Sequence, residues 1–550
     1  MSKLYNERRF NNFREIIDNS ATLFPKNDAF IIKKGENTYR KISYTELRDT
    51  FYGLCRRFIE LGYKGKRIAV MGKNCYEWVV CYLAAASVGV VVPIDKELGE
   101  QDIKNFTDAA ECCAVCADDS CIAKVTTDTA VHPFSSVEQM AKMGKSSGVS
   151  ESEIPDPEKD ELRVLLFTSG TTGSSKAVCL SQNNICVNIY STLRIVHVDS
   201  TKDSTMSILP LHHTYECTLN CILMISKGLC ISYAESLRTI ANNIKEYSPS
   251  ILVVVPELLK VLDNRIKSNI AKECPKKYRA LYENHSLAYA LRHTPFIIRA
   301  VIKKKVKATL GGKIRLFIVG AADLDTSIVD DFTALGIRTL QGYGLTECSP
   351  LLAGNNDFYF NPKSTGIAIP GVELKIENPN EDGVGEILAK GENIMLGYFN
   401  DEEATKAVFR NGWFCTGDYG RMDPDGALYI TGRKKNIIVT ENGKNIYPEE
   451  LEARLSDYEA VSDVIVVPAQ INGRIQVKAR IYPNTAAIKE ALGHIPSDEE
   501  KVAAIKKAVD EVNAVMPKYK NIRAVDILKF PLEKTTTRKV KRFGDNVEKQ

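Results

Sequence analysis

Short apolar runs separated by amphipathic helical segments constrain the fold of this chain more than any other feature. Parallel strands that are buried on both faces read as nearly continuous apolar runs, and four segments have this character: 67–72, 89–93, 250–256 and 315–320. Their alternation with helices predicts α/β layers, with helices on both faces of a sheet. The longest apolar run, 78–93, carries Gly89 and ends in Pro93, so we expect a buried helix that leads into a strand rather than a membrane span.

The pattern changes from about Gly371. Apolar and polar residues alternate around Gly, Asn and Pro turns, as in an antiparallel, barrel-like section. A compact α+β pattern follows, with a hairpin turn at 441–443, a helix start at Pro448 and a periodic helix over 498–515. The expected fold class is therefore α/β. A large multi-layer domain with α/β subdomains and a β-barrel-like section would span residues 1–432, and a small, mobile α+β domain residues 433–550.

Composition limits the kinds of binding partner and the cellular location that we expect. The 73 Lys and Arg residues and the 69 Asp and Glu residues leave a net charge of only +4, so nothing points to nucleic acid. The 15 cysteines are an odd number, they lack paired metal-ligand spacing, and no signal peptide opens the chain. We therefore expect reduced thiols and a cytoplasmic location.

Residues 167–178, "FTSGTTGSSKAV", combine hydroxyl side chains, two glycines and a lysine. A P-loop would need G-x-x-x-x-G-K-[ST], but the residue five places after Gly170 is Ser175, and Lys176 is followed by Ala177. Backbone N–H groups, hydroxyls and one cation can nevertheless wrap a polyphosphate. A solvated polar loop is the alternative interpretation.

Six further motifs follow in order along the chain. They are "LPLHHTYE" at 209–216, "GAAD" at 320–323, "QGYGLTECSP" at 341–350, "GWFCTGDYG" at 412–420, "GRKKNII" at 432–438 and "EKTTTRKVKR" at 533–542. Together with "TSGTTGSSK" at 168–176, they resemble the adenylate-forming (AMP-binding) superfamily, and the subgroup they resemble most is the long-chain fatty acyl-CoA synthetases. Members of this superfamily activate a carboxylic acid with ATP as an acyl-adenylate and then pass the acyl group to a thiol.

The resemblance implies a nucleotide site. The β- and γ-phosphates would be held by Thr168, Ser169, Thr171, Thr172 and Lys176, in a loop that Gly170 and Gly173 allow to close. Tyr343 would stack on adenine, against a wall formed by Gly320, Ala321 and Ala322. Thr346 would contact the α-phosphate and Glu347 would bind Mg²⁺. Asp418 would accept the ribose hydroxyls, with Arg433 beside the ribose and phosphate.

The resemblance also implies residues that act in catalysis, in substrate binding and in the movement of the small domain. Lys539 would be the adenylation lysine, although Arg538 stands where the family usually has glycine, and a solvated basic tail is the alternative. Lys435 would be the hinge of the small domain. Gly443 would line the path of the CoA pantetheine. His213 would orient the carboxylate or gate the acyl tunnel, and a satisfied buried histidine is the alternative.

The expected substrates are a carboxylic acid and CoA, with ATP and Mg²⁺ as cofactors. An amino acid is disfavoured because His and Thr stand in "LPLHHTYE" where an amino-acid-specific domain carries aspartate, so a fatty acid is preferred. A separate acyl carrier protein is the alternative acceptor, and a non-catalytic ligand-binding protein is the alternative function. Residues 294–307 would form a helix with apolar residues on one side and lysines at its end. A weak peripheral contact with the inner membrane surface is one interpretation, and a core-packed helix is the other.

Overall fold

The computed structural model describes residues 4–168, 176–236, 238–322, 324–439, 444–471, 474–534 and 540–542. The chain forms two compact units. The first comprises residues 4–168, 176–373 and 389–412, and the second comprises the described residues of 374–388 and 413–542. The predicted boundary at 432/433 stays a prediction.

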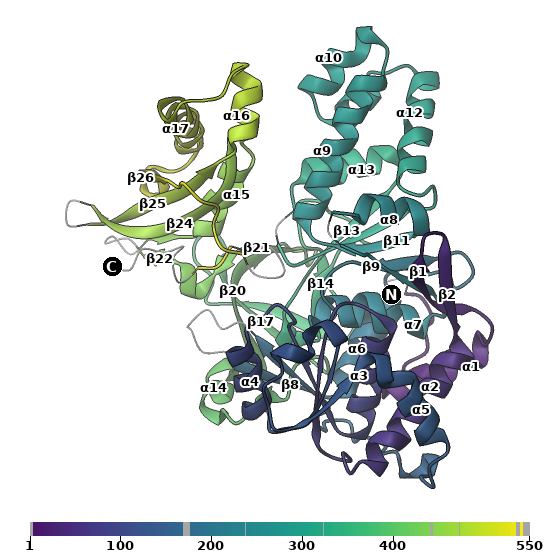
Figure 1. The fold of residues 1–550 in the computed structure, drawn as a ribbon. Helices are drawn as coiled ribbons and strands as arrows, with labels where there is room; N and C mark the ends of the chain where they lie inside the picture. The colour runs from purple at the N-terminus through teal and green to yellow at the C-terminus, as the bar shows by residue number, and fades with distance from the viewer. Residues whose placement is uncertain are drawn as a thin grey trace. The chain divides into compact units, whose positions relative to one another are not determined.

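Two mostly parallel sheets form the first unit (Figure 1). Within the described residues, one has nine strands in the order β15 (Ile367–Ala368), β14 (Leu351–Gly354), β13 (Arg338–Gly344), β12 (Leu316–Val319), β11 (Ile251–Val254), β9 (Ser204–Ser207), β10 (Cys230–Tyr233), β1 (Asp28–Gly35) and β2 (Thr38–Ser43). The other has seven, in the order β18 (Gly397–Tyr398), β8 (Lys176–Leu180), β7 (Val164–Thr168), β4 (Val90–Ile94), β3 (Arg67–Met71), β5 (Cys112–Ala117) and β6 (Ala130–Pro133). All four predicted buried strands are confirmed, as β3, β4, β11 and β12.

Helices cover these sheets because their apolar faces need burial. The first unit contains α1 (Phe13–Leu23), α2 (Tyr44–Glu60), α3 (Tyr76–Val88), α4 (Glu100–Ala109), α5 (Val137–Lys145), α6 (Gln182–Leu193), α7 (Leu223–Ser226), α8 (Ile240–Tyr247), α9 (Pro256–Glu273), α10 (Lys276–Asn284), α11 (Leu287–Arg292), α12 (Phe296–Thr309), α13 (Thr326–Leu335) and α14 (Glu402–Val408). Nearly every residue of α3 is buried, which explains why it is apolar on all sides. The predicted buried helix leading into a strand is thus confirmed as α3 followed by β4.

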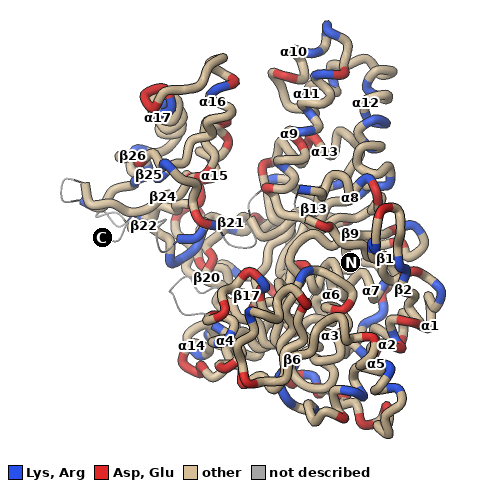
Figure 2. Tube along the Cα trace, in the orientation of Figure 1, with Lys and Arg blue, Asp and Glu red and all other residues tan. Residues whose placement is uncertain are grey.

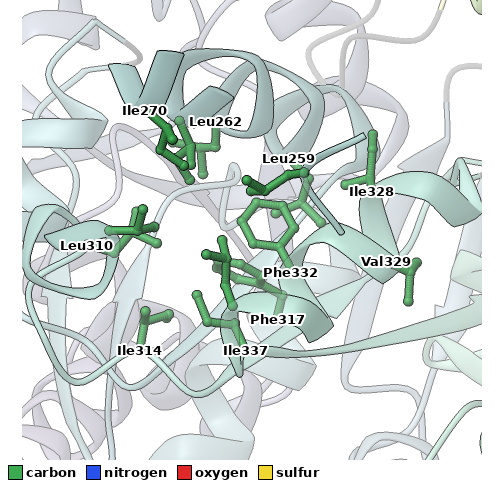
Figure 3. Close-up of a cluster of buried hydrophobic side chains, with 14 of the residues drawn as sticks. Leu259, Leu262, Ile270, Leu310, Ile314, Phe317, Ile328, Val329, Phe332 and Ile337 are labelled. Atoms are coloured by element: carbon green, nitrogen blue, oxygen red, sulfur yellow. The ribbon is translucent and has the colours of Figure 1, made fainter. Parts of the chain in front are cut away.

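A cluster of buried apolar side chains joins the helices α8 to α13, called here the helical region, to the strands β11 and β12. Phe317 of β12 meets Phe332 of α13 edge to face, with ring centroids 4.9 Å apart. Leu259 of α9 and Ile337 complete the centre of the cluster, and both are fully buried (Figure 3). This apolar packing fixes the helical region on one face of the nine-stranded sheet.

A buried ion cluster ties the same helices together. Lys267 of α9 lies 2.6 Å from the carboxylate of Asp263 and 2.8 Å from that of Asp331 on α13. Asp331 also accepts a 2.6 Å hydrogen bond from the backbone N–H of Ala288, in the first turn of α11. Burial raises the pKa of Asp263 to about 6.

The second unit is α+β. Within the part of the chain that the structure describes, a five-stranded sheet, most of which belongs to this unit, occupies the predicted barrel-like section and contains β16 (Val372–Glu377), β17 (Gly385–Gly391), β19 (Phe409–Arg410), β20 (Trp413–Met422) and β21 (Leu428–Arg433). The hairpin strands β22 (Ile438–Val439) and β23 (Asn445–Ile446) and a three-stranded sheet of β24 (Val461–Ile471), β25 (Arg474–Pro483) and β26 (Ile522–Ile527) follow. The described residues of this unit also form the helices α15 (Pro448–Ser456), α16 (Thr485–Leu492) and α17 (Asp498–Val515). The predicted helix start at Pro448 and the helix over 498–515 are confirmed, the second with a Ser497–Glu500 capping box.

Lys, Arg, Asp and Glu are interspersed along both units (Figure 2), in keeping with the small net charge. No helix among the described residues is both long and apolar enough to cross a membrane.

Candidate active site

The two sheets of the first unit meet at the carboxyl ends of their strands. Asn74, which follows β3 of the seven-stranded sheet, donates hydrogen bonds to Ser207 Oγ at 2.9 Å and to the Leu209 carbonyl at 2.6 Å, both at the end of β9 in the other sheet. It accepts a third, of 3.1 Å, from the backbone N–H of Leu211. Carboxyl ends of parallel strands are where α/β proteins bind ligands, so this junction is the candidate site. Asn74 carried no sequence signal of its own.

His213 lies in the same junction. Its ring centroid is 4.1 Å from that of His212, whose Nε2 atom lies 3.6 Å from a carboxylate oxygen of Asp95, at the end of β4. Burial, with a smaller contribution from the charge of Lys96, lowers the pKa of His212 to about 4, so this imidazole is neutral at physiological pH. The π-helix η4 (Tyr215–Ile222) follows directly, and π-helical turns are frequent at functional sites.

The predicted adenine wall and Tyr343 lie at the ends of neighbouring strands. Gly320 follows β12, Tyr343 is a buried residue of β13, and the two strands pair in parallel. A Cβ atom at Gly320 would lie 3.1 Å from the ring of Tyr215, so glycine keeps the wall close to η4. Ala321 has a φ of 75°, a left-handed conformation that is uncommon for alanine and recurs at functional sites.

The 3-10 helix η5 (Thr346–Cys348) carries Thr346 and Glu347. A Cβ atom at Gly344 would lie 1.9 Å from the Pro350 carbonyl oxygen, so the turn into η5 requires glycine. Asn393 donates a 2.9 Å hydrogen bond to the Cys348 carbonyl and fixes the end of η5. The turn that presents Glu347 is therefore held from both sides.

Thr168, the last residue of β7, pairs with Lys176, the first residue of the antiparallel strand β8. The Thr168 hydroxyl donates a 3.2 Å hydrogen bond to the Lys176 carbonyl. Both ends of the predicted phosphate loop are thus defined. Its other predicted residues lie outside the described part of the chain: Ser169, Gly170, Thr171, Thr172 and Gly173.

Tyr398 of β18 contacts both Lys176 and Glu347, a role that no sequence motif indicated. Its hydroxyl donates a 3.1 Å hydrogen bond to Glu347 Oε1, and the Lys176 Nζ atom lies 4.6 Å from its ring centroid. Burial first, and then the Glu347 charge, raise the pKa of Tyr398, so the hydroxyl keeps its proton. Lys176, which is expected to bind phosphate, and Glu347, which is expected to bind Mg²⁺, therefore contact the same side chain, Tyr398.

Glu347 fits a magnesium ligand. Mg²⁺ is usually held by one or two carboxylates together with water and substrate phosphates. Within the described residues no cluster of three His, Cys, Asp or Glu side chains could hold a metal by itself. A single carboxylate that shares Tyr398 with Lys176, the lysine expected to bind phosphate, matches a metal that arrives with a nucleotide.

In the second unit, the structure brings Asp418 and Arg433 together. They face each other on the antiparallel strands β20 and β21, and Arg433 Nε lies 3.2 Å from Asp418 Oδ1. Asp418 is only 4% exposed. A buried carboxylate held by a guanidinium is a suitable acceptor for a diol. Lys435 lies in the 3-10 helix η6 (Lys434–Asn436), and its role as a hinge stays a prediction.

Two other predicted residues, Gly443 and Lys539, lie outside the described residues. On either side of 535–539 the chain is anchored within the second unit. Lys534 lies 2.7 Å from the buried carboxylate of Asp463, and the Lys541 backbone N–H donates a 2.9 Å hydrogen bond to the Glu533 carbonyl.

Residues 17–399 match the family described as AMP-binding enzyme, and residues 435–543 match the AMP-binding enzyme C-terminal domain. The chain belongs to this family.

Named relatives agree with that membership. Long-chain-fatty-acid–CoA ligase FadD15 of Mycobacterium bovis is 27% identical over 527 residues, which cover 88% of this chain and 87% of that protein. Long-chain-fatty-acid–CoA ligase 5 of Mus musculus is 28% identical over 480 residues, which cover 79% of this chain and 70% of that protein. The solved structure of O-succinylbenzoate coenzyme A synthetase from Bacillus subtilis, in complex with ATP and magnesium ion, has the same fold, with a TM-score of 0.72 at 21% identity over 96% of this chain and 98% of that one. The predicted family and fold are confirmed, and the expected ATP, Mg²⁺ and CoA fit an AMP-binding enzyme whose relatives are CoA ligases.

Proposed function

We propose that this chain is an AMP-forming acid–CoA ligase that activates a fatty acid. The observation that carries the proposal is the convergence of Lys176 and Glu347 on Tyr398. A phosphate-binding lysine and a metal-binding carboxylate must reach the same nucleotide, and these two come from segments far apart in sequence. The matched long-chain-fatty-acid–CoA ligases support a fatty acid as substrate.

In the first half-reaction, a carboxylate oxygen attacks the α-phosphorus of ATP, and the bond to the β-phosphate breaks. Negative charge gathers in this step, so fixed cations and hydrogen-bond donors accelerate it. Lys176 and the Thr168 end of the loop would hold the leaving pyrophosphate, and Thr346 would contact the α-phosphate. Magnesium held by Glu347 would neutralise phosphate charge. Lys539 would stabilise the transferring group.

The rest of the site would hold the nucleoside and the acid. Tyr343 and the Gly320–Ala322 turn would enclose adenine, and Asp418 would accept the ribose hydroxyls. His213, beside a neutral His212, would contact the substrate carboxylate end. In the second half-reaction the CoA sulfur attacks the acyl carbon, AMP leaves, and the thiol proton passes to solvent. Gly443 would lie along the pantetheine path.

The proposal predicts pyrophosphate release that depends on the acid. We expect fatty acids to support release, with aryl and amino acids much weaker, and CoA to accelerate AMP release. A pyrophosphate assay across these three acid classes, with and without CoA, measures this. A preference for aryl or amino acids would contradict the assigned substrate. Acceleration by acyl carrier protein instead of CoA would favour the alternative acceptor, and no release with any acid would favour a non-catalytic ligand-binding protein.

We further propose that α12 contacts an anionic membrane surface. The predicted helix is present and one side of it packs on the core, as the core-packed alternative expects, but Phe296 and Ile297 are 73% and 76% exposed and Val301 is 51% exposed. Ile302 and Val306, on the opposite side, are the residues that enter the core. Basic residues follow along the helix (Figure 2), and an exposed apolar face beside lysines suits lipid headgroups and acyl chains.

A Phe296→Ser/Ile297→Ser variant should bind anionic vesicles at least about tenfold less than the parent chain, because each buried side chain contributes roughly 1.5–3 kcal/mol. Co-sedimentation with phosphatidylglycerol-containing vesicles at about 0.1 M salt measures the change. Leu23→Ser, which removes a 61% exposed residue from α1, is the control and should bind like the parent. No binding by the parent chain would refute the membrane contact.

A further inference from the structure

The segment 393–399 joins two parts of the candidate site through its backbone. The Leu396 N–H donates a 2.9 Å hydrogen bond to the Cys179 carbonyl on β8, the strand that begins at Lys176. One residue earlier, the Met395 N–H donates a 2.8 Å hydrogen bond to the Glu347 carbonyl on η5. The segment therefore fixes the distance between the lysine strand and the carboxylate turn.

Tyr398 occupies a constrained place on this segment. Gly397 before it has a φ of 147°, and a Cβ atom there would lie 2.9 Å from the Thr405 side chain. The Tyr398 backbone N–H donates a 2.8 Å hydrogen bond to Thr405 Oγ1. The Gly397 backbone and the Thr405 side chain thus determine where the Tyr398 ring lies.

The two contacts of the side chain serve different partners. The hydroxyl donates to Glu347 Oε1, which orients the carboxylate. The ring face takes the Lys176 ammonium, with Nζ 4.6 Å from the centroid. A charge-assisted hydrogen bond to phosphate is stronger than a cation–π contact, so phosphate can displace the ring from Lys176.

We propose that Tyr398 is a positioning residue that keeps Lys176 and Glu347 from neutralising each other before MgATP binds. This inference rests on the proposed function. Without the ring, the long Lys176 side chain can pair directly with the Glu347 carboxylate, and both nucleotide and metal must then break that ion pair. With the ring, Lys176 is held by an interaction that phosphate easily displaces, while Glu347 stays oriented for magnesium.

Two substitutions separate the two contacts. Tyr398→Phe removes only the hydroxyl, so the Mg²⁺ concentration that half-saturates nucleotide binding should rise about three- to tenfold, while ATP affinity at saturating Mg²⁺ stays close to that of the parent chain. Tyr398→Leu also removes the ring, so ATP affinity should fall at least about fivefold even at saturating Mg²⁺. The double variant Tyr398→Leu/Glu347→Gln should bind ATP with the same affinity as the single variant Glu347→Gln. Without the Glu347 carboxylate, Lys176 has no competing ion pair to form, so loss of the ring has no further effect.

Equilibrium binding of a fluorescent ATP analogue, titrated at several Mg²⁺ concentrations, measures these changes without turnover. Tyr52→Phe, which removes a 2.8 Å tyrosine–carboxylate hydrogen bond to Asp18 elsewhere in the first unit, is the matched control and should leave both quantities unchanged. Equal Mg²⁺ dependence in Tyr398→Phe and the parent, equal ATP affinity in Tyr398→Leu and Tyr398→Phe, or no MgATP binding by the parent would overturn the inference. MgATP binding with the expected shifts but no pyrophosphate release would support it while refuting the proposed function.

Discussion

A Lys267→Met variant should lose about 3–5 kcal/mol of stability in the helical region formed by α9, α11 and α13, because removing one partner of a buried ion cluster leaves uncompensated charge. Lys267 is the cation between two carboxylates that are almost completely buried, Asp263 at 2% and Asp331 at 0% side-chain exposure. Methionine keeps the length of the side chain, so lost packing contributes little. Hydrogen–deuterium exchange of these helices measures the effect, and protection should fall by at least about a hundredfold.

The loss should depend on pH. The pKa of Asp263 is about 6 in the folded chain, above its unfolded value, so its contribution to stability is full at pH below the unfolded pKa and is lost as pH rises through about 6. Lys267 lowers the pKa of Asp263 against the effect of burial, so removing Lys267 raises that folded pKa further. The difference between variant and parent should therefore be largest near pH ~8 and shrink near pH ~5.

Two further variants act as controls for this effect. Lys305→Met breaks a 3.1 Å pair with Glu273 in the same helical region, but both side chains are more than 60% exposed, and the change should stay within about 1 kcal/mol. Adding Asp263→Asn to Lys267→Met should restore part of the stability, because it removes one of the two stranded charges. If Lys267→Met and Lys305→Met behave alike, the cluster does not stabilise these helices.

A Lys539→Ala variant should lose acyl-adenylate formation by about a hundredfold or more, the usual effect of removing a charged group that stabilises a transition state. Thioester formation from supplied acyl-adenylate and CoA should persist. The expectation comes from the position of Lys539 in the motif at 533–542, and single-turnover assays of the two half-reactions measure it.

Lys541→Ala is the matched control, two residues away. Its ammonium lies 3.2 Å from a Glu533 carboxylate oxygen, an exposed pair whose loss should change either half-reaction by no more than about twofold. Equal loss of both half-reactions in Lys539→Ala would argue against a specific adenylation role. Similar, small effects of both substitutions would indicate that this segment is a solvated basic tail.

The fold was predictable where local sequence determines local structure. β11 and β12 were predicted as strands because parallel strands buried on both faces are continuously apolar, and α17 was predicted from its periodicity. The orientation of α12 was not predictable. Apolar residues lie on two sides of this helix, and which side faces the core depends on how α9 and α13 pack, which no local pattern records.

The candidate site was predictable only residue by residue. Lys176 and Glu347 stood out because each lies in a motif, yet their shared contact with Tyr398 depends on the pairing of β18 with β8, where Tyr398 faces Val178. A Gly-Tyr pair in a β-rich segment does not indicate which strand it will pair with, or in which register. Asp95 was missed for the same reason, because it approaches His212 only when two different sheets meet.

The pairing of β18 with β8 also bears on how the chain is made. β8 is an interior strand of the finished seven-stranded sheet, but its outer partner is synthesised on the order of 200 residues later. At 5–20 residues per second, a ribosome needs on the order of 10–40 s to deliver it. During that interval the apolar edge of β8 is open to pairing with other chains, the kind of edge that promotes aggregation. The yield of this protein should therefore depend more on the amount of chaperone available during translation than on the stability of the folded chain.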